Sequence, residues 1–369
     1  MKPLRAAWYL PEVVERRAGL RYRCLYPMAR LRQRGLDVGL LSPGDGQNFD
    51  TVVFDAWGLF PTTAGESQAE SSLRLALDLK SHGVKIVLDN CDNQFAGAPS
   101  EAWQRACQRL RNLALLADRV VTCSSSLADE MVNECQLQSR PRVIGDPIET
   151  EIRYSSDRPL KSLLSPGRKL SWLRYLRHRY RLAHDRSTGA TPLVWFGSHG
   201  NGFAEGGMLD LKRIAPIMAE VHRKHPLSLT VISNNRPKFD AEFARQSFPT
   251  HYLEWDRINF LASLRLHAIS VIPVTANRFT ACKSANRVAL SLYHGLNVAA
   301  DTIPSYEEFS AVCALDNWEQ GLANYLSNPV LRQTHQAEGA KLAAARYSAE
   351  RVADRWAQVL FQGWGHGRA

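Results

Sequence analysis

Short apolar, β-rich runs alternate with helical patterns along the chain, and this alternation constrains the fold more than any other feature of the sequence. In the first half, the apolar runs are bounded by Gly, Pro or Asp, as buried parallel strands are. The expected strands are Val38–Leu41, Thr51–Phe54, Lys85–Leu88, Arg119–Thr122 and Val143–Ile144. Helical patterns with apolar residues three and four apart occupy Tyr22–Arg34, Glu66–Ser81, Ser100–Ala117 and Leu127–Cys135. The alternation predicts a doubly wound parallel sheet of the α/β class.

The same pattern restarts after Thr191 and predicts a second α/β domain. Its expected strands are Pro192–Phe196, Leu227–Ile232, Ile269–Val274 and Val298–Ala300, and its expected helices are Leu209–Lys224, Phe239–Gln246, Arg257–Leu266, Asn286–His294 and Ser348–Phe361. We expect four parts: an N-terminal domain over 1–150, a basic linker or insert over 151–190, a C-terminal domain over 191–345, and a helix within 346–369 that crosses back to the first domain. Two Rossmann-like domains would face each other across a cleft, with ligands beyond the carboxyl ends of the strands.

Composition excludes several other classes of protein. The 369 residues are 45% hydrophobic and 22% charged, which is globular and not disordered, collagenous or disulfide-stapled. No apolar run reaches the ~20 residues that a membrane span needs, and the N-terminus lacks the apolar core of a secretion signal. The seven cysteines form no C-x-x-C pair, which indicates reduced thiols of a cytoplasmic protein and no zinc site.

Positive charge is concentrated in one segment. Nine of the basic residues and a single acidic residue lie between Arg158 and Arg186, which gives +8 of the net +10. Residues 170–182 read LSWLRYLRHRYRL, and at 100° per residue the apolar and basic side chains separate onto two faces. The apolar face holds Trp172, Leu173, Leu176 and Tyr180, and the other holds Arg174, Arg177, His178 and Arg181. Such a helix suits an anionic membrane surface. An interdomain helix with its apolar face on its own protein, a helix that binds a partner protein, and nucleic-acid binding are the alternatives.

Two aspartates follow the strand that ends at Leu88. Asp89-Asn-Cys-Asp92 would lie beyond the strand end, where a carboxylate can orient a hydroxyl or act as a base. The same residues would equally well start a loop and cap the next turn.

Glycines follow the first strand of the second domain. Gly197-Ser198-His199-Gly-Asn201-Gly and a later Gly-Gly form a strand-to-helix turn whose backbone N–H groups could approach a phosphate. The spacing matches neither the P-loop nor the G-x-G-x-x-G fingerprint.

A second cluster suited to phosphate reads Lys283-Ser284-Ala-Asn286-Arg287. Lys283 and Arg287 are four residues apart, so we expect them on one face at the start of a helix. Two cations at a helix N-terminus favour an anionic ligand such as a pyrophosphate. The alternative is two solvated surface charges.

Weaker candidates lie elsewhere in the chain. Arg21 and Arg23, near the start of the first helix, could hold an anionic substrate or face solvent. Trp255 could stack on a nucleobase or belong to the core. Tyr306, Glu307 and Glu308 could bind a ribose or sugar hydroxyl, or cap a helix.

The order of these motifs resembles that of GT-B glycosyltransferases, near the family-4-like enzymes that use nucleotide sugars in bacterial glycan pathways. The resemblance covers nearly the whole chain and rests on the segments GLDV (35–38), ADRVVTCSS (117–125), VIGDPIE (143–149), WFGS (195–198) and LYHGLNVAA (292–300). Two features of the family are absent. Cys282 and Leu290 stand where the family carries two glutamates that grip the donor, and the Arg/Lys pair after the first strand of the C-terminal domain is missing. The N-domain histidine of the family aligns with Cys91, while Asp92 remains.

The resemblance implies an acceptor domain over 1–150 and a nucleotide-sugar domain over 191–345. Donor diphosphate binding would fall to Gly197, Ser198, His199, Asn201, Lys283, Ser284, Asn286 and Arg287. Trp255, Tyr306, Glu307 and Glu308 would bind the base or sugar, Arg21 and Arg23 the acceptor, and Asp89 or Asp92 would orient or deprotonate it. GT-B enzymes typically need no metal, so we expect neither a metal nor a cofactor besides the donor.

We therefore expect a metal-independent, hexosyltransferase-type glycosyltransferase of bacterial surface polysaccharide biosynthesis. It would be cytoplasmic, peripheral on the inner face of the cytoplasmic membrane, and would act on a glycan or a lipid-linked oligosaccharide rather than on nucleic acid. The docking residues would be Trp172, Arg174, Leu176, Arg177, Tyr180 and Arg181. The alternatives are an epimerase-type enzyme for nucleotide sugars on the same scaffold, and a catalytically silent protein that binds a glycan or a partner enzyme.

Overall fold

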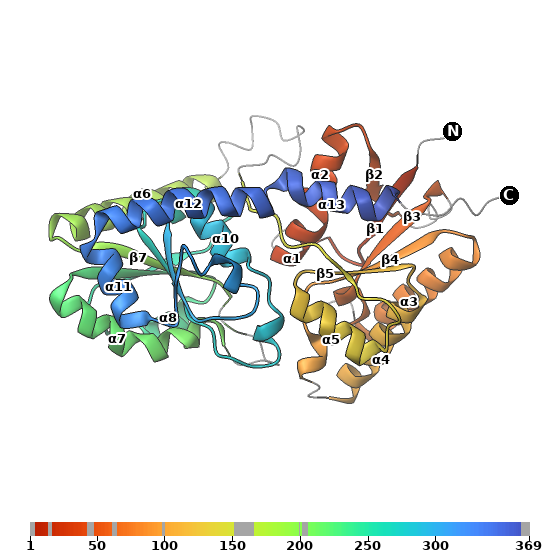
Figure 1. Ribbon diagram of the computed structural model, residues 1–369, viewed down its shortest axis with the longest axis horizontal. Coiled ribbons are helices and arrows are strands. Elements are labelled where there is room, and N and C mark those ends of the chain that lie inside the picture. Colours follow the sequence, from red (N-terminus) through yellow and green to blue (C-terminus); the bar gives the residue numbers. More distant parts are fainter. Residues whose placement is uncertain are drawn as a thin grey trace. The chain divides into compact units, whose positions relative to one another are not determined.

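The chain forms two compact units, each built on one six-stranded parallel sheet. The computed structural model describes residues 4–13, 17–42, 48–60, 65–97, 100–150, 166–198, 200 and 206–362. Unit 1 comprises residues 1–149, 277–286 and 346–369, and unit 2 comprises 150–276 and 287–345. The predicted α/β class with two doubly wound sheets is confirmed (Figure 1).

The sheet of unit 1 has the strand order β2-β1-β3-β4-β5-β6. Its strands are β1 (Arg5–Tyr9), β2 (Asp37–Leu40), β3 (Thr51–Asp55), β4 (Lys85–Asn90), β5 (Arg119–Thr122) and β6 (Arg142–Val143). Its main helices are α1 (Ala18–Leu20), α2 (Tyr26–Gln33), α3 (Gly65–Ser81), α4 (Glu101–Leu116), α5 (Ser125–Cys135) and α13 (Ala349–Phe361). The π-helical turn η1 (Arg21–Leu25) joins α1 to α2, and the short 3-10 turns are η3 (Ala56–Leu59), η4 (Gln94–Ala96) and η7 (Thr280–Cys282).

Alternate residues of these strands face two different helical layers. Val52, Phe54, Ile86 and Leu88 pack in the hydrophobic core under α3, α4 and α5. On the opposite face, Trp8 meets Trp356 of α13 edge to face, with ring centroids 5.5 Å apart. Both faces of the sheet are therefore covered, as the nearly continuous apolar runs of the strands require.

The sheet of unit 2 has the order β12-β11-β10-β7-β8-β9. Its strands are β7 (Thr191–Phe196), β8 (Leu227–Ser233), β9 (Thr250–Glu254), β10 (Ile269–Ile272), β11 (Asn297–Ala300) and β12 (Ala314–Leu315). Its helices are α6 (Pro166–Ser187), α7 (Leu211–Lys224), α8 (Arg236–Glu242), α9 (Phe260–Leu264), α10 (Asn286–Tyr293), α11 (Trp318–Ser327) and most of α12 (Pro329–Tyr347), with the 3-10 turns η6 (Gly207–Asp210) and η8 (Glu307–Phe309).

Four predicted helices of unit 2 have different bounds in the structure. The helix expected over Leu209–Lys224 begins two residues later, and the helix expected over Arg257–Leu266 covers only Phe260–Leu264. The helix expected over Phe239–Gln246 is α8, which begins three residues earlier because the Asn235 side chain caps it by accepting from the Lys238 N–H at 3.0 Å. The helix expected over Asn286–His294 ends one residue earlier, at Tyr293. The last helix begins where predicted, with Ser348 as its N-cap. None of the described helices is both long and apolar enough to cross a membrane.

A buried histidine cluster holds α6 against the sheet of unit 2. His178 of α6 lies 3.4 Å from His267, ring nitrogen to ring nitrogen, and His267 lies 2.9 Å from the Thr230 hydroxyl of β8. About two helical turns further on, Asp185 pairs with His251 of β9 at 2.7 Å. Burial lowers the pKa of His178 to about 2 and the pKa of His267 to about 4.

Acid should therefore destabilise unit 2. Unfolded His binds its proton near pH 6.5, whereas folded His178 and His267 do not, so the free energy of unfolding falls as the pH drops through 6.5. At pH 5.5 each histidine lowers the free energy of unfolding by about 1.4 kcal/mol relative to its value at pH 8. Urea titrations at the two pH values measure this loss, and His178→Gln should remove about half of it. The comparison variant His82→Gln changes an exposed histidine in the turn after α3 and should have a clearly smaller effect than His178→Gln. Equal effects of both variants would contradict the assignment.

Candidate functional site

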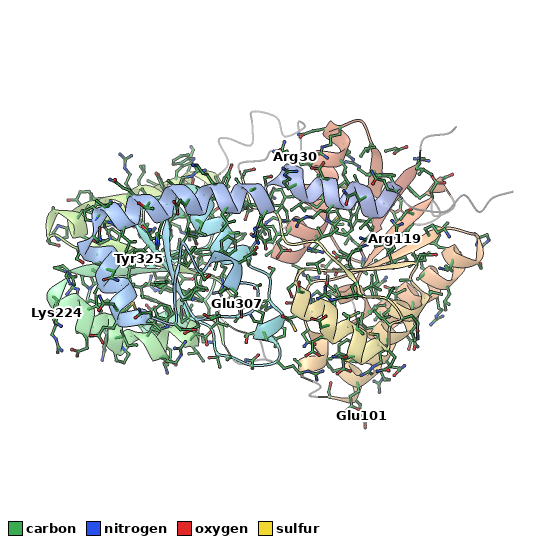
Figure 2. The ribbon with its side chains drawn as sticks, in the orientation of Figure 1. Arg30, Glu101, Arg119, Lys224, Glu307 and Tyr325 are labelled. Atoms are coloured by element: carbon green, nitrogen blue, oxygen red, sulfur yellow. The ribbon has the colours of Figure 1, made fainter. Side chains whose placement is uncertain are left out.

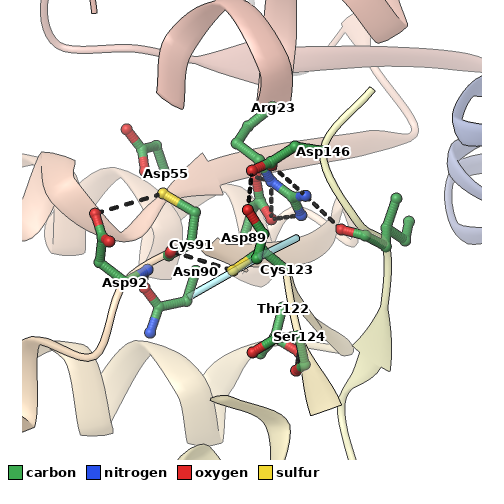
Figure 3. Close-up of polar contacts among 12 residues, drawn as sticks. Arg23, Asp55, Asp89, Asn90, Cys91, Asp92, Thr122, Cys123, Ser124 and Asp146 are labelled. Carbon is green, nitrogen blue, oxygen red and sulfur yellow. Dashed lines mark hydrogen bonds and ion pairs between the residues drawn. The ribbon is translucent and has the colours of Figure 1, made fainter. Parts of the chain in front are cut away.

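The polar side chains of unit 1 gather at the carboxyl ends of β3, β4 and β5 (Figure 3). Asp55 ends β3, Asp89 lies opposite it in the register of β4, and Asp92 follows that strand. Neighbouring parallel strands bring their carboxyl ends to one edge, which explains why residues far apart in sequence meet here. The sequence predicted Asp89 and Asp92 at this edge and missed Asp55, although Asp55 directly follows the predicted strand Thr51–Phe54 as Asp89 follows Lys85–Leu88.

Arg23 is the buried centre of this edge. Its side chain lies on η1, is 4% exposed, and donates from Nε and Nη2 to the two oxygens of Asp89 at 3.0 and 2.6 Å. Its Nη1 donates to Asp146 at 3.3 Å and to the carbonyl of Ile144. Burial opposes the charge of Arg23, but the adjacent Asp89 carboxylate outweighs it and holds the pKa of Arg23 above its ordinary value.

The expected acceptor role of Arg21 and Arg23 is therefore corrected. Arg21 is 2% exposed and pairs with Glu149 at 3.2 Å, and that carboxylate also accepts hydrogen bonds from the hydroxyls of Tyr22 and Tyr26. Neither guanidinium faces solvent, and each is engaged by carboxylates of its own unit. Asp89, 2% exposed, likewise holds Arg23 and is closed to an acceptor.

Asp92 is more accessible than Asp89. Its side chain is 19% exposed, one oxygen accepts the Trp57 indole N–H at 3.0 Å, and the other pairs with the Lys283 ammonium. The backbone N–H of Trp57 donates to Asp55 at 3.2 Å, so one tryptophan orients two carboxylates. Burial, reinforced by the charge of Asp89, raises the pKa of Asp55 to about 7.

The two thiols at this edge are not nucleophiles at neutral pH. Burial raises the pKa of Cys91 and of Cys123 well above the ordinary value, so both stay protonated. The Cys123 thiol donates to the carbonyl of Cys91 at 3.2 Å, which ties β5 to the loop after β4. In the described parts of the chain, no three His, Cys, Asp or Glu side chains form a group that could hold a metal ion.

Residues 277–286 pack into unit 1, which the sequence did not predict. Ser124 donates to the carbonyl of Cys282 at 2.7 Å, Ser284 donates to Asp146 at 2.5 Å, and Arg278 pairs with Glu134 at 2.5 Å. Lys283 precedes α10 with an extended backbone, so the expected shared helix face of Lys283 and Arg287 is wrong. Lys283 lies with Asp92 in unit 1, whereas Arg287 lies in unit 2.

Unit 2 carries the glycine turn after β7. Gly200, Gly206 and Gly207 have φ values of +115°, +129° and +79°, which disfavour any side chain. A Cβ on Gly207 would lie 2.7 Å from the backbone nitrogen of Gly200. The Gly207 N–H donates to Asp210 at 2.8 Å, and Asp210 accepts from the Thr275 hydroxyl at 2.5 Å, which fixes the far end of the turn. Of the predicted ligands in this turn, His199 and Asn201 lie outside the described residues.

Two cationic side chains lie beside this turn. A Cβ at Gly197 would be 3.7 Å from a guanidinium nitrogen of Arg287, and one at Gly200 would be 3.5 Å from the Lys238 ammonium. The sequence predicted Arg287 and missed Lys238. Lys238 could have been found from its position soon after β8, the strand next to β7. The carboxyl ends of neighbouring parallel strands lie at one edge of the sheet, so residues that follow β8 come close to the glycine turn.

The remaining predicted donor residues differ in accessibility. Trp255 follows β9 and is half-buried, with its ring 6.3 Å from that of Phe260. Tyr306 is 1% exposed, so its expected contact with the donor is corrected. Glu307 is exposed and Glu308 half-buried at the start of η8 (Figure 2 labels Glu307).

The comparisons with known proteins bear on the fold alone. No family model and no curated protein matches this sequence. A glycosyltransferase from Rickettsia africae is 8% identical, with a TM-score of 0.57 over 98% of both chains. A structure described as "Trehalose-6-phosphate from E. coli bound with UDP-2-fluoro glucose" is 11% identical, with a TM-score of 0.56 over 96% of this chain and 98% of that one. A putative UDP-N-acetylglucosamine 2-epimerase from Listeria monocytogenes is 13% identical, with a TM-score of 0.51 over 96% and 95%.

Removal of Arg23 should destabilise unit 1 strongly. Arg23→Met leaves Asp89 and Asp146 without their buried counter-charge, for which we expect a loss of about 3–5 kcal/mol in the free energy of unfolding. The control Arg74→Met breaks an ion pair whose partners are 74% and 50% exposed, and should cost at most about 1 kcal/mol. Urea denaturation measures both, and losses of similar size would show that the Arg23 pair is not structurally dominant.

Gly207→Ala tests the glycine turn. The substitution adds left-handed strain of about 1–2 kcal/mol and a contact with backbone at 2.7 Å. Gly295→Ala is the matched control, because its φ of +80° imposes the same strain with no atom within 4 Å of the added Cβ. We expect Gly207→Ala to lower the urea midpoint clearly more than Gly295→Ala does. Equal midpoints would mean that the turn does not need this close backbone approach.

The chain has the GT-B fold, in which two Rossmann-like units each carry one parallel sheet; the similar structures include glycosyltransferases.

Proposed function

We propose that this protein is a glycosyltransferase that moves a sugar from a nucleotide-sugar donor to a glycan or lipid-linked acceptor. The observation that carries the proposal is the glycine turn of unit 2, with Arg287 and Lys238 beside it, on a GT-B fold. Two cationic side chains beside a turn suit a diphosphate, because each can form a charge-assisted hydrogen bond with a phosphate oxygen. The solved structure with bound UDP-2-fluoro glucose has the same fold and supports a donor of this class.

Unit 2 would stabilise the leaving group. As the bond between the anomeric carbon and the donor phosphate oxygen breaks, negative charge develops on the departing nucleoside diphosphate. Arg287 and Lys238 lie where they can neutralise this charge, and we therefore propose metal-independent transfer. Half-buried Trp255 follows the carboxyl end of β9 and is the proposed stacking partner of the base.

Unit 1 would hold the acceptor. Asp92 is the accessible carboxylate at its strand ends, and Trp57 and Lys283 fix its two oxygens. We propose that Asp92 orients the attacking hydroxyl, whose oxygen forms the new bond to the anomeric carbon. Asp55, with a pKa of about 7, lies on the adjacent strand and can take up the released proton near neutral pH.

The biological setting is part of the same proposal. We place the enzyme in bacterial surface polysaccharide biosynthesis as a hexosyltransferase-type, cytoplasmic protein on the inner face of the membrane. The acceptor would be a lipid-linked oligosaccharide presented at an anionic lipid surface.

Two other functions have specific support. The match to a putative UDP-N-acetylglucosamine 2-epimerase favours an enzyme that rearranges a nucleotide sugar instead of transferring it. Cys282 and Leu290, which replace the donor-gripping glutamates of the family, are 2% and 1% exposed. This replacement favours a catalytically silent protein that binds a glycan or a partner enzyme.

Donor binding can be tested by a thermal-shift screen against UDP, GDP, CDP, ADP, dTDP and their common sugars. A nucleotide at 100 times its dissociation constant should stabilise the protein by about 2.7 kcal/mol. Arg287→Ala should weaken binding by roughly ten- to a hundredfold, since a hydrogen bond to a charged group contributes about 1.5–3 kcal/mol. The control Arg223→Ala, on the exposed surface of α7, should bind normally. No response to any nucleotide would contradict the donor site.

Product analysis then separates the three functions. Release of nucleoside diphosphate with sugar on an acceptor or on water supports transfer, and insensitivity to EDTA supports the metal-independent form. An isomerised sugar on an intact diphosphate would instead support the epimerase. Binding without any turnover would support the silent protein.

A further inference from the structure

Helix α6 exposes its apolar side chains to solvent. Five of the 14 exposed large hydrophobic residues of the described chain lie on this one helix. Trp172, Leu173, Leu176 and Tyr180 are 50%, 58%, 50% and 79% exposed, and at 100° per residue they fall within one band about 12 Å long. We call these four residues the α6 apolar band.

The opposite face of α6 is polar and faces unit 2. Ser171, His178 and Asp185 are each at most 5% exposed. Among the α6 residues whose burial the structure describes, Leu182 is the one fully buried apolar residue. Ser171 accepts a hydrogen bond from Asn259 at 2.6 Å, and the ring of His178 lies against His267. An ordinary surface helix buries its apolar side, so α6 is inverted. Of the residues predicted on the basic face, His178 is buried, whereas Arg174, Arg177 and Arg181 are exposed. The exposure of the apolar band contradicts the alternative in which the apolar face packs on its own protein.

Several arginines of α6 are exposed to solvent. Arg174, Arg177, Arg179 and Arg181 are exposed, and none of them forms an ion pair with another described residue. Arg213 and Arg236, also exposed in unit 2, do form ion pairs, with Asp301 and with Asp240. By helical angle, Arg177 and Arg179 flank the α6 apolar band on its two sides. The result is an apolar strip bordered by exposed arginines that form no ion pair among the described residues.

We infer that the α6 apolar band and its flanking arginines form a docking surface for an anionic lipid bilayer. A bilayer interface accommodates this set of side chains. The indole and the phenol would lie at the level of the headgroups, the leucines would lie below them, and the guanidinium groups would reach the lipid phosphates. The exposed positive charge of α6 complements the negative charge of an anionic lipid surface, whereas an uncharged apolar partner would gain nothing from it. The purpose of the docking, delivery of a lipid-linked acceptor, rests on the proposed function. The inference that α6 binds a bilayer is independent of that function.

The experiment is co-sedimentation of the full chain with vesicles of phosphatidylcholine alone or of phosphatidylcholine with phosphatidylglycerol. We expect binding to the anionic vesicles, weakened by added salt. The triple variant R177Q/R179Q/R181Q should lower partitioning by roughly a hundredfold, since each cation near the surface contributes about a factor of five. W172S/L176S/Y180S should lower it at least tenfold. Because all six side chains are exposed, the variants should keep the wild-type melting temperature.

The matched control is K212Q/R223Q/K224Q on α7, which removes the same charge from the opposite helical layer of unit 2 (Figure 2 labels Lys224). It should bind vesicles like the wild type. The inference is overturned if this control loses as much vesicle binding as the α6 variants, or if the variant W172S/L176S/Y180S binds normally. It is also overturned if the wild type does not bind anionic vesicles and instead dimerises or binds RNA through α6. The nucleotide thermal shift, measured on the same variants, should be unchanged, so that failure of docking and failure of the donor site are told apart.

Discussion

The buried charge of Arg23 is the interaction on which the rest of unit 1 depends. A guanidinium that is 4% exposed is tolerated only if its donors are satisfied, and here two carboxylates and one carbonyl do so. Those acceptors come from β4 and from the segment after β6, while the guanidinium also lies 5.6 Å from the Trp356 ring of α13. One side chain thus joins the first helical layer, the centre of the sheet and the last helix.

This arrangement also determines where residues 277–286 lie. Asp146 gives one oxygen to Arg23 and accepts the Ser284 hydroxyl with the other, so the buried pair and the returning segment share a carboxylate. Ser284 is adjacent to Lys283, which reaches Asp92. The cation that the sequence associated with the donor phosphates therefore orients the carboxylate of unit 1 instead. The positive charge beside the glycine turn comes from Arg287 and from Lys238.

The sequence predicted what depends on local pattern. Both sheets, the strand ends with Asp89 and Asp92, the glycine turn and the Ser348 cap follow from periodicity and turn chemistry, which act over a few residues. The pairings did not follow, because the partners lie far apart in the chain. Asp89 is 66 residues from Arg23, and Asp92 is 191 residues from Lys283. Charge and spacing alone predicted that Arg21 and Arg23 bind an acceptor or face solvent, and that Lys283 and Arg287 share a helix face. The tertiary structure buries the first pair and separates the second.

Helix α6 shows the same limit in a different form. Periodicity gives the angles between side chains correctly, but it does not say which side of a helix faces the protein. In α6 specific polar contacts determine which side faces the protein. Asp185 pairs with His251, and His178 contacts His267 and Thr230. Such contacts fix the rotation of the helix about its axis, because a turn of even 100° would bury an arginine or leave Asp185 without its partner. As a consequence the apolar side faces outward and stays hydrated, which is unfavourable in free energy. Transfer of the α6 apolar band from water into lipid would remove this unfavourable term. The polar contacts of Asp185 and His178 therefore hold the helix in the orientation that a lipid surface would stabilise.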